Sequence, residues 1–357
     1  MKIHHIINSY DIKLGGAESL VVSLKDHLIF KNIPTHIYGI MKNVEKIDNA
    51  SNAGLENPYS LKAFLSIKNY IKANVKDEDI IHSHLFPSNF YCSIIKLLKF
   101  TNAKLITTEH STSNRRRGNI LGKIIDAIIY HPCTLIICIS NGVEKKLNDW
   151  ITKNSKKTRV IQNGCILNKN IKSFKNFNNK TVKIVSVGSL KDSKNYATTI
   201  KAIKKIKKLD FLWQIAGDGY LYKKLNDLVK RFNLNKKIQF LGYVNDVNEL
   251  LDNANIFLIP SKWEGFGLAV VEAMHSSLPI IASNVDGLKE IVSNEQTCSL
   301  LIDPNDIEDI AIALEKLIKS RNLRETLGRN AYHNSLGYNI EKMFEKYIAV
   351  YNKLNKN

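Results

Sequence analysis

Two glutamates, Glu264 and Glu272, stand eight residues apart around a glycine-containing stretch. Residues 256–260 are apolar and predict a buried strand, and a helix is expected to begin near Gly267. Ligands of parallel sheets bind beyond the carboxyl ends of the strands, where the amides of a helix N-terminus attract phosphate. The amides expected to bind an anion here belong to Gly265, Phe266, Gly267 and Leu268.

The two carboxylates need a partner other than that anion. Because a carboxylate beside a phosphate is repelled, Glu264 and Glu272 are expected to face the hydroxyl groups of a sugar or a ribose. For Glu272, an incidental acid in the first turns of a helix explains the sequence equally well. Enzymes that hydrolyse glycosides also use two carboxylates, but a loop rich in phosphate-binding amides disfavours hydrolysis of a plain glycoside.

The elements that would position these residues alternate between strands and helices. In the first half, strands are expected at residues 2–8, 35–40, 79–82, 104–108 and 134–139, and helices at 17–30, 61–73, 90–98 and 120–129. In the second half, strands are expected at 183–187, 212–216, 238–241, 256–260 and 279–282, and helices at 196–208, 221–231, 247–251 and 267–275. This alternation predicts an α/β fold with two doubly wound parallel sheets.

The length of 357 residues fits two domains. The first is expected at residues 1–167 and the second at 181–336, and the polar stretch 168–180, rich in Asn and Lys, predicts a linker between them. Residues 337–357 are expected to form a separate C-terminal helix, for which packing back on the first domain is one option.

The composition is that of a folded protein with a strong positive charge. Hydrophobic residues make up 44% of the chain, and 52 Lys and Arg against 33 Asp and Glu give a net charge of +19. This charge fits an anionic partner, but the abundance of Lys, Ile and Asn also fits the coding bias of an AT-rich gene. Without a signal peptide or a long apolar run, the expected location is the cytoplasm, and the five scattered cysteines are expected to be reduced and mostly buried.

The stretch from Glu264 to Glu272 resembles the E-x7-E signature of the retaining GT-B glycosyltransferases, specifically family 4, which includes bacterial polysaccharide and lipid-sugar transferases. The resemblance implies two Rossmann-like domains that face a cleft, with acceptor bound by the first and nucleotide-sugar donor by the second. It also implies that the transferred sugar keeps its anomeric configuration and that no metal or other cofactor is required.

Further landmarks occur in the family's order. Gly15-Gly16 resembles the glycine loop whose amides approach the donor phosphate and sugar, and His110 resembles the histidine that contacts the transferred sugar. The residues that resemble the rest of the donor site are Gly188, Ser189, Lys194, Gly217, Gly219, Tyr243 and Val244. Ser140-Asn141-Gly142 and Ile161-Gln162-Asn163-Gly164 are similar to other landmarks. The resemblance therefore implies His110, Glu264 and Lys194 as the catalytic residues.

One position departs from the family. Many members have Arg where this chain has Ser189, so the diphosphate site lacks one cation unless Lys191 or the amides of residues 265–268 compensate. We therefore expect weaker donor binding than in members that have this arginine.

Metal and dinucleotide sites are disfavoured. Asp77-Glu78-Asp79 has the D-x-D spacing of a metal motif, but it precedes a strand and is interpreted as a solvated turn. Of His82 and His84 we expect one to be buried and the other to hydrogen-bond a sugar or an acceptor. Gly217-Asp218-Gly219 begins like a dinucleotide fingerprint, but Tyr222 occupies the place of the third glycine, so NAD binding is not expected.

Basic residues stand beside an apolar helix in the first domain. Arg115, Arg116 and Arg117 precede the apolar helix expected at 120–129, and together they either contact anionic lipid and a lipid-linked diphosphate or form a solvated loop. The resemblance to the family implies transfer of a hexose from a UDP- or GDP-sugar to a saccharide or polyprenyl-diphosphate-linked acceptor in bacterial surface polysaccharide synthesis, including lipopolysaccharide. The protein is then peripheral on the inner face of the membrane.

Two other functions remain as alternatives. A nucleotide-sugar epimerase has the same two-domain architecture but transfers nothing to an acceptor. A basic nucleic-acid-binding protein would explain the charge of +19, but the sequence has no recognition motif and no alternation of aromatic with basic residues, so no nucleic acid is expected as a partner.

Overall fold

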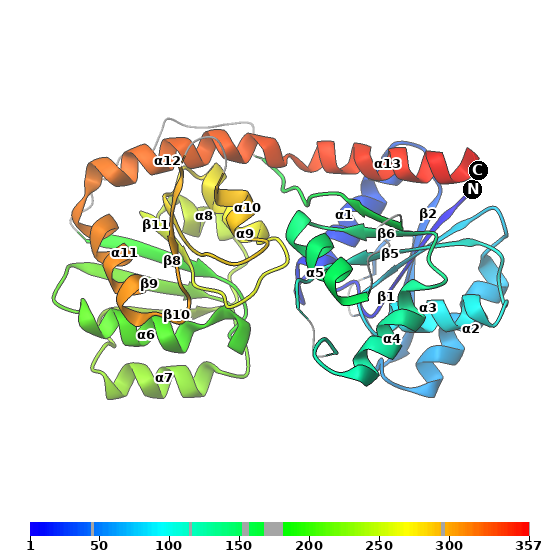
Figure 1. The fold of residues 1–357 in the computed structure, drawn as a ribbon, viewed down its shortest axis with the longest axis horizontal. Helices are drawn as coiled ribbons and strands as arrows, with labels where there is room; N and C mark the ends of the chain where they lie inside the picture. The colour runs from blue at the N-terminus through cyan, green and yellow to red at the C-terminus, as the bar shows by residue number, and fades with distance from the viewer. Residues whose placement is uncertain (44–45, 114–115, 152–156, 168–180, 294–296, 357) are drawn as a thin grey trace. The chain divides into compact units, whose positions relative to one another are not determined.

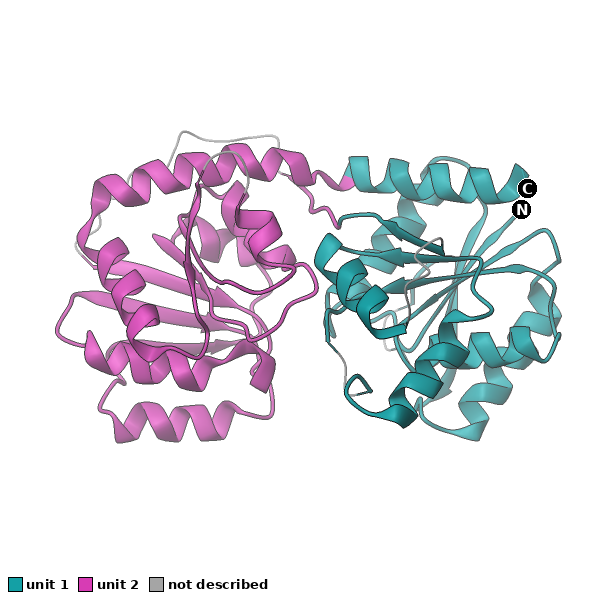
Figure 2. Ribbon diagram, in the orientation of Figure 1, with its two compact units in different colours: residues 1–162, 341–357 teal, residues 163–340 magenta. Residues whose placement is uncertain are grey.

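The computed structural model describes residues 1–43, 46–113, 116–151, 157–167, 181–293 and 297–356. Its first compact unit comprises residues 1–162 and 341–357, and its second comprises residues 163–340 (Figure 2). The linker predicted at 168–180 and Arg115 both lie outside the described residues.

The described part of the first unit contains one sheet of seven parallel strands, in the order β3-β2-β1-β4-β5-β6-β7 (Figure 1). The strands are β1 (Ile3–Ile7), β2 (Thr35–Met41), β3 (Ala50–Leu55), β4 (Ile80–His84), β5 (Lys104–Glu109), β6 (Leu135–Cys138) and β7 (Thr158–Val160). The helices are α1 (Gly16–Phe30), α2 (Leu61–Asn74), α3 (Ser88–Leu97), α4 (Ile120–Tyr130), α5 (Asn141–Ile151) and α13 (Ile340–Lys356).

The described part of the second unit contains six parallel strands in the order β10-β9-β8-β11-β12-β13. The strands are β8 (Val182–Val187), β9 (Phe211–Ala216), β10 (Ile238–Gly242), β11 (Ile256–Ile259), β12 (Ile280–Ser283) and β13 (Ser299–Ile302). The helices are α6 (Tyr196–Lys205), α7 (Tyr222–Arg231), α8 (Val247–Asp252), α9 (Leu268–His275), α10 (Lys289–Val292), α11 (Ile307–Lys319) and α12 (Arg321–Ser335), with short 3-10 turns at Asp192–Lys194 and Leu336–Tyr338.

Both sheets confirm the predicted doubly wound α/β fold. The central strands β1, β4 and β11 are buried along their whole length, because helices cover both faces of a parallel sheet. In each sheet the strand order reverses once, between β1 and β4 and between β8 and β11. Such a reversal is where doubly wound sheets bind ligands.

The C-terminal helix α13 belongs to the first unit. Its buried face carries Met343, Phe344, Tyr347, Val350 and Tyr351. The Tyr351 hydroxyl lies 2.8 Å from Nδ1 of His82 on β4, and the ring of Phe344 lies 4.5 Å from that of His27 on α1. The last residues of the chain therefore complete the hydrophobic core that its first residues begin.

Candidate active site

Three loops pack against one another beyond the carboxyl ends of β8, β9 and β10. The amide of Gly217 donates to the carbonyl of Gly242, and the amide of Leu190 donates to that of Asp218. Gly217 has a φ of 135°, and a Cβ atom there would lie 2.3 Å from the carbonyl oxygen of Gly188. Only glycine allows this approach, so Gly217 holds the loops after β8 and β9 together.

The structure brings Lys194 and Glu264 into contact although 70 residues separate them. Nζ of Lys194 donates to Oε2 of Glu264 at 2.7 Å, and both side chains are about one fifth exposed, at 18% and 20%. Lys194 follows β8 and Glu264 follows its neighbour β11, which explains how the two loops meet. The hydroxyl of Ser261 donates to the same carboxylate oxygen at 3.3 Å.

The start of α9 is held by two glycines. Gly267 caps the helix with a φ of 92°. At Gly287, after β12, a Cβ atom would lie 2.4 Å from the carbonyl oxygen of Glu264. The loop from Glu264 to Gly267 is therefore fixed from two sides. The unpaired N-terminal amides of α9, which form the positive end of the helix dipole, lie at the carboxyl end of the sheet.

Glu272 lies in the middle of α9 and is half-buried. Burial raises the pKa of its carboxyl group above the ordinary value. A half-buried acid with a raised pKa fits a hydrogen-bonding role better than a solvated surface position. Phe266 contributes only its backbone to the loop surface, because its ring is buried against Tyr338 at 5.6 Å.

Tyr243 and Val244 follow β10 at the same edge of the sheet. The amide of Tyr243 donates to the carboxylate of Asp218 at 3.1 Å, and its side chain is 54% exposed. Gly219 packs against the backbone of Leu190, since a Cβ atom there would lie 2.5 Å from the Leu190 carbonyl oxygen. The predicted donor residues of the second unit therefore gather at the carboxyl edge of β8, β9, β10 and β11.

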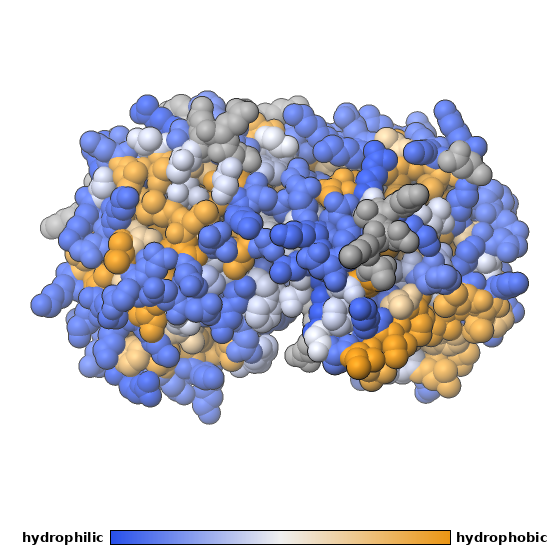
Figure 3. Space-filling model, in the orientation of Figure 1, coloured by the Kyte–Doolittle hydropathy of each residue, from blue (hydrophilic) through white to orange (hydrophobic). Residues whose placement is uncertain are grey.

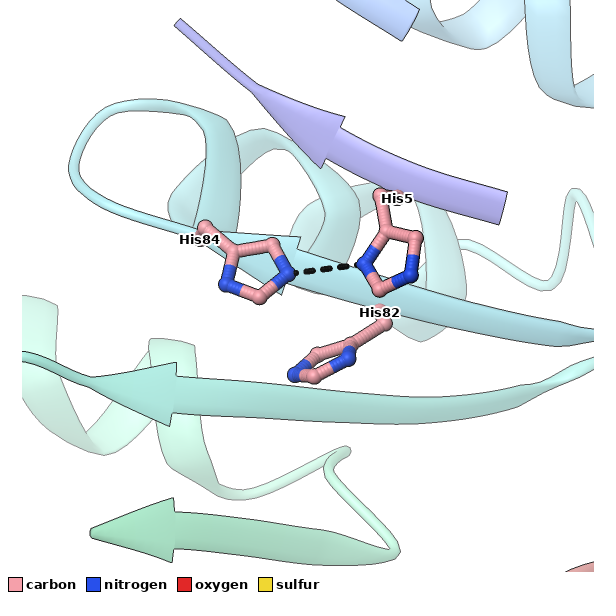
Figure 4. A group of neighbouring side chains, drawn as sticks. All are labelled: His5, His82 and His84. Carbon is pink, nitrogen blue, oxygen red and sulfur yellow. Dashed lines mark hydrogen bonds between the residues drawn. The ribbon is translucent and has the colours of Figure 1, made fainter. Parts of the chain in front are cut away.

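In the first unit, His110 directly follows β5 and belongs to a row of histidines. Nε2 of His110 lies 3.4 Å from Nδ1 of His84. Figure 4 shows the next contact in the row, in which Nε2 of His84 lies 3.0 Å from Nδ1 of His5. Burial lowers the pKa of His110 to about 4 and holds that of His84 well below 6.5. Both rings are therefore neutral at pH 7, and each has one N–H donor and one acceptor nitrogen for the hydrogen bonds of the row.

The expectation that one of His82 and His84 faces a ligand is wrong. Both side chains are fully buried. Residues two apart on a strand point to the same face of the sheet, so His82 and His84 share one environment instead of dividing between the core and a ligand. His82 is hydrogen-bonded at both nitrogens, to Tyr351 and to Oγ1 of Thr108. His84 contacts His110 instead of presenting its own ring to solvent.

His5, His82 and His84 are close enough to hold a metal ion, since one ligand atom of each lies within 4.8 Å of the others. Four of their six ring nitrogens already bond to each other or to hydroxyl groups, and a fifth, Nδ1 of His84, faces His110. Hydrogen bonding therefore accounts for this arrangement, and we assign no metal to it.

The structure shows partners for two of the three arginines and corrects the interpretation of Asp79 as part of a solvated turn. Arg116 pairs with the buried Asp126 at 2.7 Å and stacks on Phe86, and Arg117 donates to the carbonyl of Thr112 at 2.7 Å. Both guanidinium groups are thus committed to structural partners.

Asp79 does not belong to a solvated turn, because its side chain is buried. Its carboxylate accepts hydrogen bonds from the backbone amides of Lys2 and Lys76. Burial raises the pKa of Asp79, but these hydrogen bonds outweigh burial, and the pKa lies below its ordinary value.

Sequence reasoning missed several partners of these residues. Ser261, Asp218 and His5 all touch predicted site residues, but none was itself predicted as a site residue, although Asp218 lies between Gly217 and Gly219. The positions of Ser261 and Asp218 at the ends of predicted strands carry the signal that points to them. His5 has no such signal, because its link to His84 depends on the pairing of β1 with β4.

Two family models match adjacent parts of the chain. The model described as Glycosyltransferase Family 4 matches residues 14–169, and the model described as Glycosyl transferases group 1 matches residues 168–334. Within the described residues, no helix combines the length and the apolar character needed to cross a membrane.

Several known proteins resemble the chain. An uncharacterized glycosyltransferase of Methanocaldococcus jannaschii is 30% identical over 360 residues, which covers 96% of this chain and 95% of the relative. A UDP-Gal:alpha-D-GlcNAc-diphosphoundecaprenol alpha-1,3-galactosyltransferase of Escherichia coli is 36% identical over 148 residues, 40% of this chain and 37% of that enzyme. Sucrose-phosphate synthase of Thermosynechococcus elongatus has the same fold, with a TM-score of 0.84 at 20% identity and 99% of both chains covered.

Proposed function

Because the chain belongs to glycosyltransferase family 4 and has the GT-B fold, we propose that it transfers a hexose from a nucleotide-sugar to a lipid-linked saccharide with retention of configuration. The observation that carries the proposal is the contact between Lys194 and Glu264 at the strand-order reversal of the second unit. A cation and a carboxylate side by side suit a ligand that has a diphosphate next to sugar hydroxyls.

The donor is a UDP- or GDP-sugar in this proposal. Lys194 and the amides of residues 266–268 stabilise the negative charge that the diphosphate gains as it leaves. Glu264 and Glu272 bind hydroxyl groups, and the exposed ring of Tyr243 lies against the base. Charge stabilisation by a lysine and amides needs no metal, so the proposed reaction has no cofactor.

The acceptor binds the first unit in this proposal. The Escherichia coli relative is named for a sugar acceptor linked to diphosphoundecaprenol, and such a substrate is confined to a membrane surface. The acceptor hydroxyl attacks the anomeric carbon from the face of the leaving group, and the departing phosphate oxygen takes its proton. The neutral ring of His110 orients the transferred sugar by hydrogen bonding. The protein acts on the inner face of the cell membrane, in surface polysaccharide synthesis.

A thermal-shift panel of UDP-, GDP- and ADP-sugars and NAD tests the donor. A ligand at about 100 times its dissociation constant adds about 2.7 kcal/mol of stability. We expect one nucleotide class to raise the melting temperature, and Glu272→Ala to abolish the shift while Glu315→Ala on the exposed face of α11 retains it. Stabilisation by NAD alone would contradict the proposal.

Product analysis tests the reaction. With the stabilising donor and a diphosphate-linked saccharide, the new linkage should have the anomeric configuration of the donor by nuclear magnetic resonance. Conversion of the donor to its epimer without any acceptor would instead identify an epimerase.

A further inference from the structure

Apolar side chains are exposed on three neighbouring helices of the first unit. Helix α3 packs against both α2 and α4. The exposed apolar residues are Leu61 and Leu65 on α2, Leu97 and Leu98 at the end of α3, and Ile120, Leu121 and Ile124 on α4. Figure 3 shows this group as an orange area over α4 and its neighbours. We call it the α2–α4 surface.

The first turns of α4 are the most exposed part of this surface. Ile120 is 82% exposed and Leu121 68%. The inner face of the helix is already occupied, since Asp126, Ile129 and Tyr130 are buried. Scattered apolar residues on a surface are ordinary, but a contiguous group on adjacent helices is typical of an interaction site.

The charges of these helices are unusually one-sided. Helices α2, α3 and α4 together contain five lysines, namely Lys62, Lys68, Lys72, Lys96 and Lys123, and a single acid, Asp126. Asp126 is fully buried and accepts hydrogen bonds from Arg116 and from Nε1 of Trp150. The ammonium group of Lys96 donates to the backbone carbonyls of Asn102 and Ala103. The other four lysines and the apolar groups face solvent, and none of the three helices presents a carboxylate there.

We propose that the α2–α4 surface docks on a bilayer that contains anionic phospholipid. The leucines and isoleucines enter the interfacial region, and the lysine side chains reach the headgroup phosphates with their alkyl stems along the apolar surface. This inference rests on the proposed function, because a polyprenyl-linked acceptor is held in the bilayer and the α2–α4 surface belongs to the unit proposed to bind it. A surface without exposed carboxylates suits anionic lipid.

Vesicle co-sedimentation tests the docking. The full-length protein should bind vesicles of equal parts phosphatidylcholine and phosphatidylglycerol, and bind pure phosphatidylcholine more weakly. Replacing Ile120, Leu121 and Ile124 together by Ser should lower the partition coefficient by about tenfold or more. The control carries Phe30→Ser and Ile312→Ser, two exposed apolar positions outside this surface, and should bind like the wild type.

A second variant separates charge from apolar contact. Lys62→Glu with Lys123→Glu should weaken binding to the anionic vesicles and leave binding to phosphatidylcholine unchanged. Unchanged anionic-vesicle binding by both variants would overturn the proposal. So would a wild-type dimer that the triple serine variant converts to a monomer without loss of vesicle binding, because the surface would then bind a second copy.

Donor binding distinguishes this failure from failure of the proposed function. The triple serine variant should keep the thermal shift with its nucleotide-sugar and its transfer rate to a water-soluble acceptor, while losing transfer to an acceptor embedded in vesicles. If no nucleotide-sugar raises the melting temperature of the wild type, the proposed transferase function is refuted. Vesicle binding by the wild type and the triple serine variant then still decides whether the α2–α4 surface docks on lipid.

Discussion

At the scale of single residues, the contact between Lys194 and Glu264 has two consequences for binding. The Glu264 carboxylate forms an ion pair with Lys194, the residue proposed to bind the donor diphosphate. An incoming donor would therefore compete with Glu264 for the ammonium group of Lys194. In the proposed function, the displaced carboxylate then accepts hydrogen bonds from sugar hydroxyls. Glu264 is therefore expected to oppose binding of the nucleotide and to favour binding of the sugar.

Glu264→Gln should separate these two effects. The affinity for the free nucleoside diphosphate should rise roughly fivefold, because about 1 kcal/mol of competing ion-pair energy disappears. The transfer rate should fall about tenfold to a hundredfold, since the sugar loses a charged hydrogen-bond acceptor. Titration calorimetry and steady-state kinetics measure the two quantities, with Glu315→Gln as the control. Weaker nucleoside diphosphate binding by Glu264→Gln would contradict this account.

Ser189→Arg tests the missing cation beside the diphosphate. Ser189 follows Gly188 directly after β8, at the same strand end as Lys194, so an arginine there adds a bidentate donor for phosphate. The donor dissociation constant should fall by about tenfold, the effect expected of one charged hydrogen bond. A dissociation constant equal to that of the wild type in calorimetry would show that Lys191 or the loop amides already compensate.

At the scale of elements, β1 and β4 carry a layer of neutral histidines in the hydrophobic core. Burial lowers the pKa of His5 to about 3, and it lowers the pKa values of His82 and His84 well below 6.5. In the unfolded chain these groups titrate near pH 6.5. Between about pH 6.5 and the lower pKa values, the unfolded chain binds more protons, so the free energy of unfolding decreases as the pH falls.

The free energy of unfolding of the first unit should therefore be lower at pH 5 than at pH 7.5 in urea titrations. His5→Gln removes one of the titrating groups and should reduce this difference, although it also lowers stability at pH 7.5. The control His333→Gln changes an exposed histidine on α12 and should leave the difference intact. An equal pH dependence in His5→Gln and the wild type would show that the buried histidines do not cause it.

The sequence predicted most elements whose apolar pattern is strong and missed edge strands whose pattern is weak. The buried run that forms β11 stands out, whereas β3 and β7 are edge strands with few apolar residues. The expected series also ends at residues 279–282, before β13, α11 and α12. Helix α11 has a plain apolar stripe, with Ile310, Leu314 and Leu317 buried, that single-sequence reasoning could have used.

The candidate site shows a similar division. Glu264, Lys194 and His110 could be named as candidates from motifs that resemble those of the family, each of which follows a predicted strand. Their partners could not, because the contact of Lys194 with Glu264 depends on β8 lying beside β11, which local periodicity does not reveal. Likewise, no local pattern shows that Arg116 points to Asp126 rather than to solvent.

At the scale of the whole molecule, the first unit is built from two separate stretches of chain. Five side chains of α13 are buried in it, including Tyr347 and Tyr351 with no exposed surface. Burial of each such side chain contributes roughly 1.5–3 kcal/mol, so α13 as a whole supplies an amount comparable to the entire stability of an ordinary domain, about 5–15 kcal/mol.

Deletion of residues 341–357 should therefore unfold the first unit and leave the second unit folded. Hydrogen exchange followed by mass spectrometry should show lost protection across residues 1–162 and retained protection in β8–β13. Deletion of only residues 355–357 is the control, because it keeps every buried side chain of α13. Protection of β1 and β4 in the longer deletion would show that the unit folds without its C-terminal segment.

The discontinuity of the first unit also affects the order in which the two units can fold during synthesis. A ribosome completes all strands of the first sheet long before it adds residues 341–357, so the emerging N-terminal half must wait with an uncovered apolar face. The second unit, continuous from residue 163 to 340, has all of its residues available earlier than the first. We therefore expect the half of the protein that is synthesised first to be the last to reach its native state, and we expect a stalled or prematurely terminated chain to expose that unfinished half to chaperones and proteases.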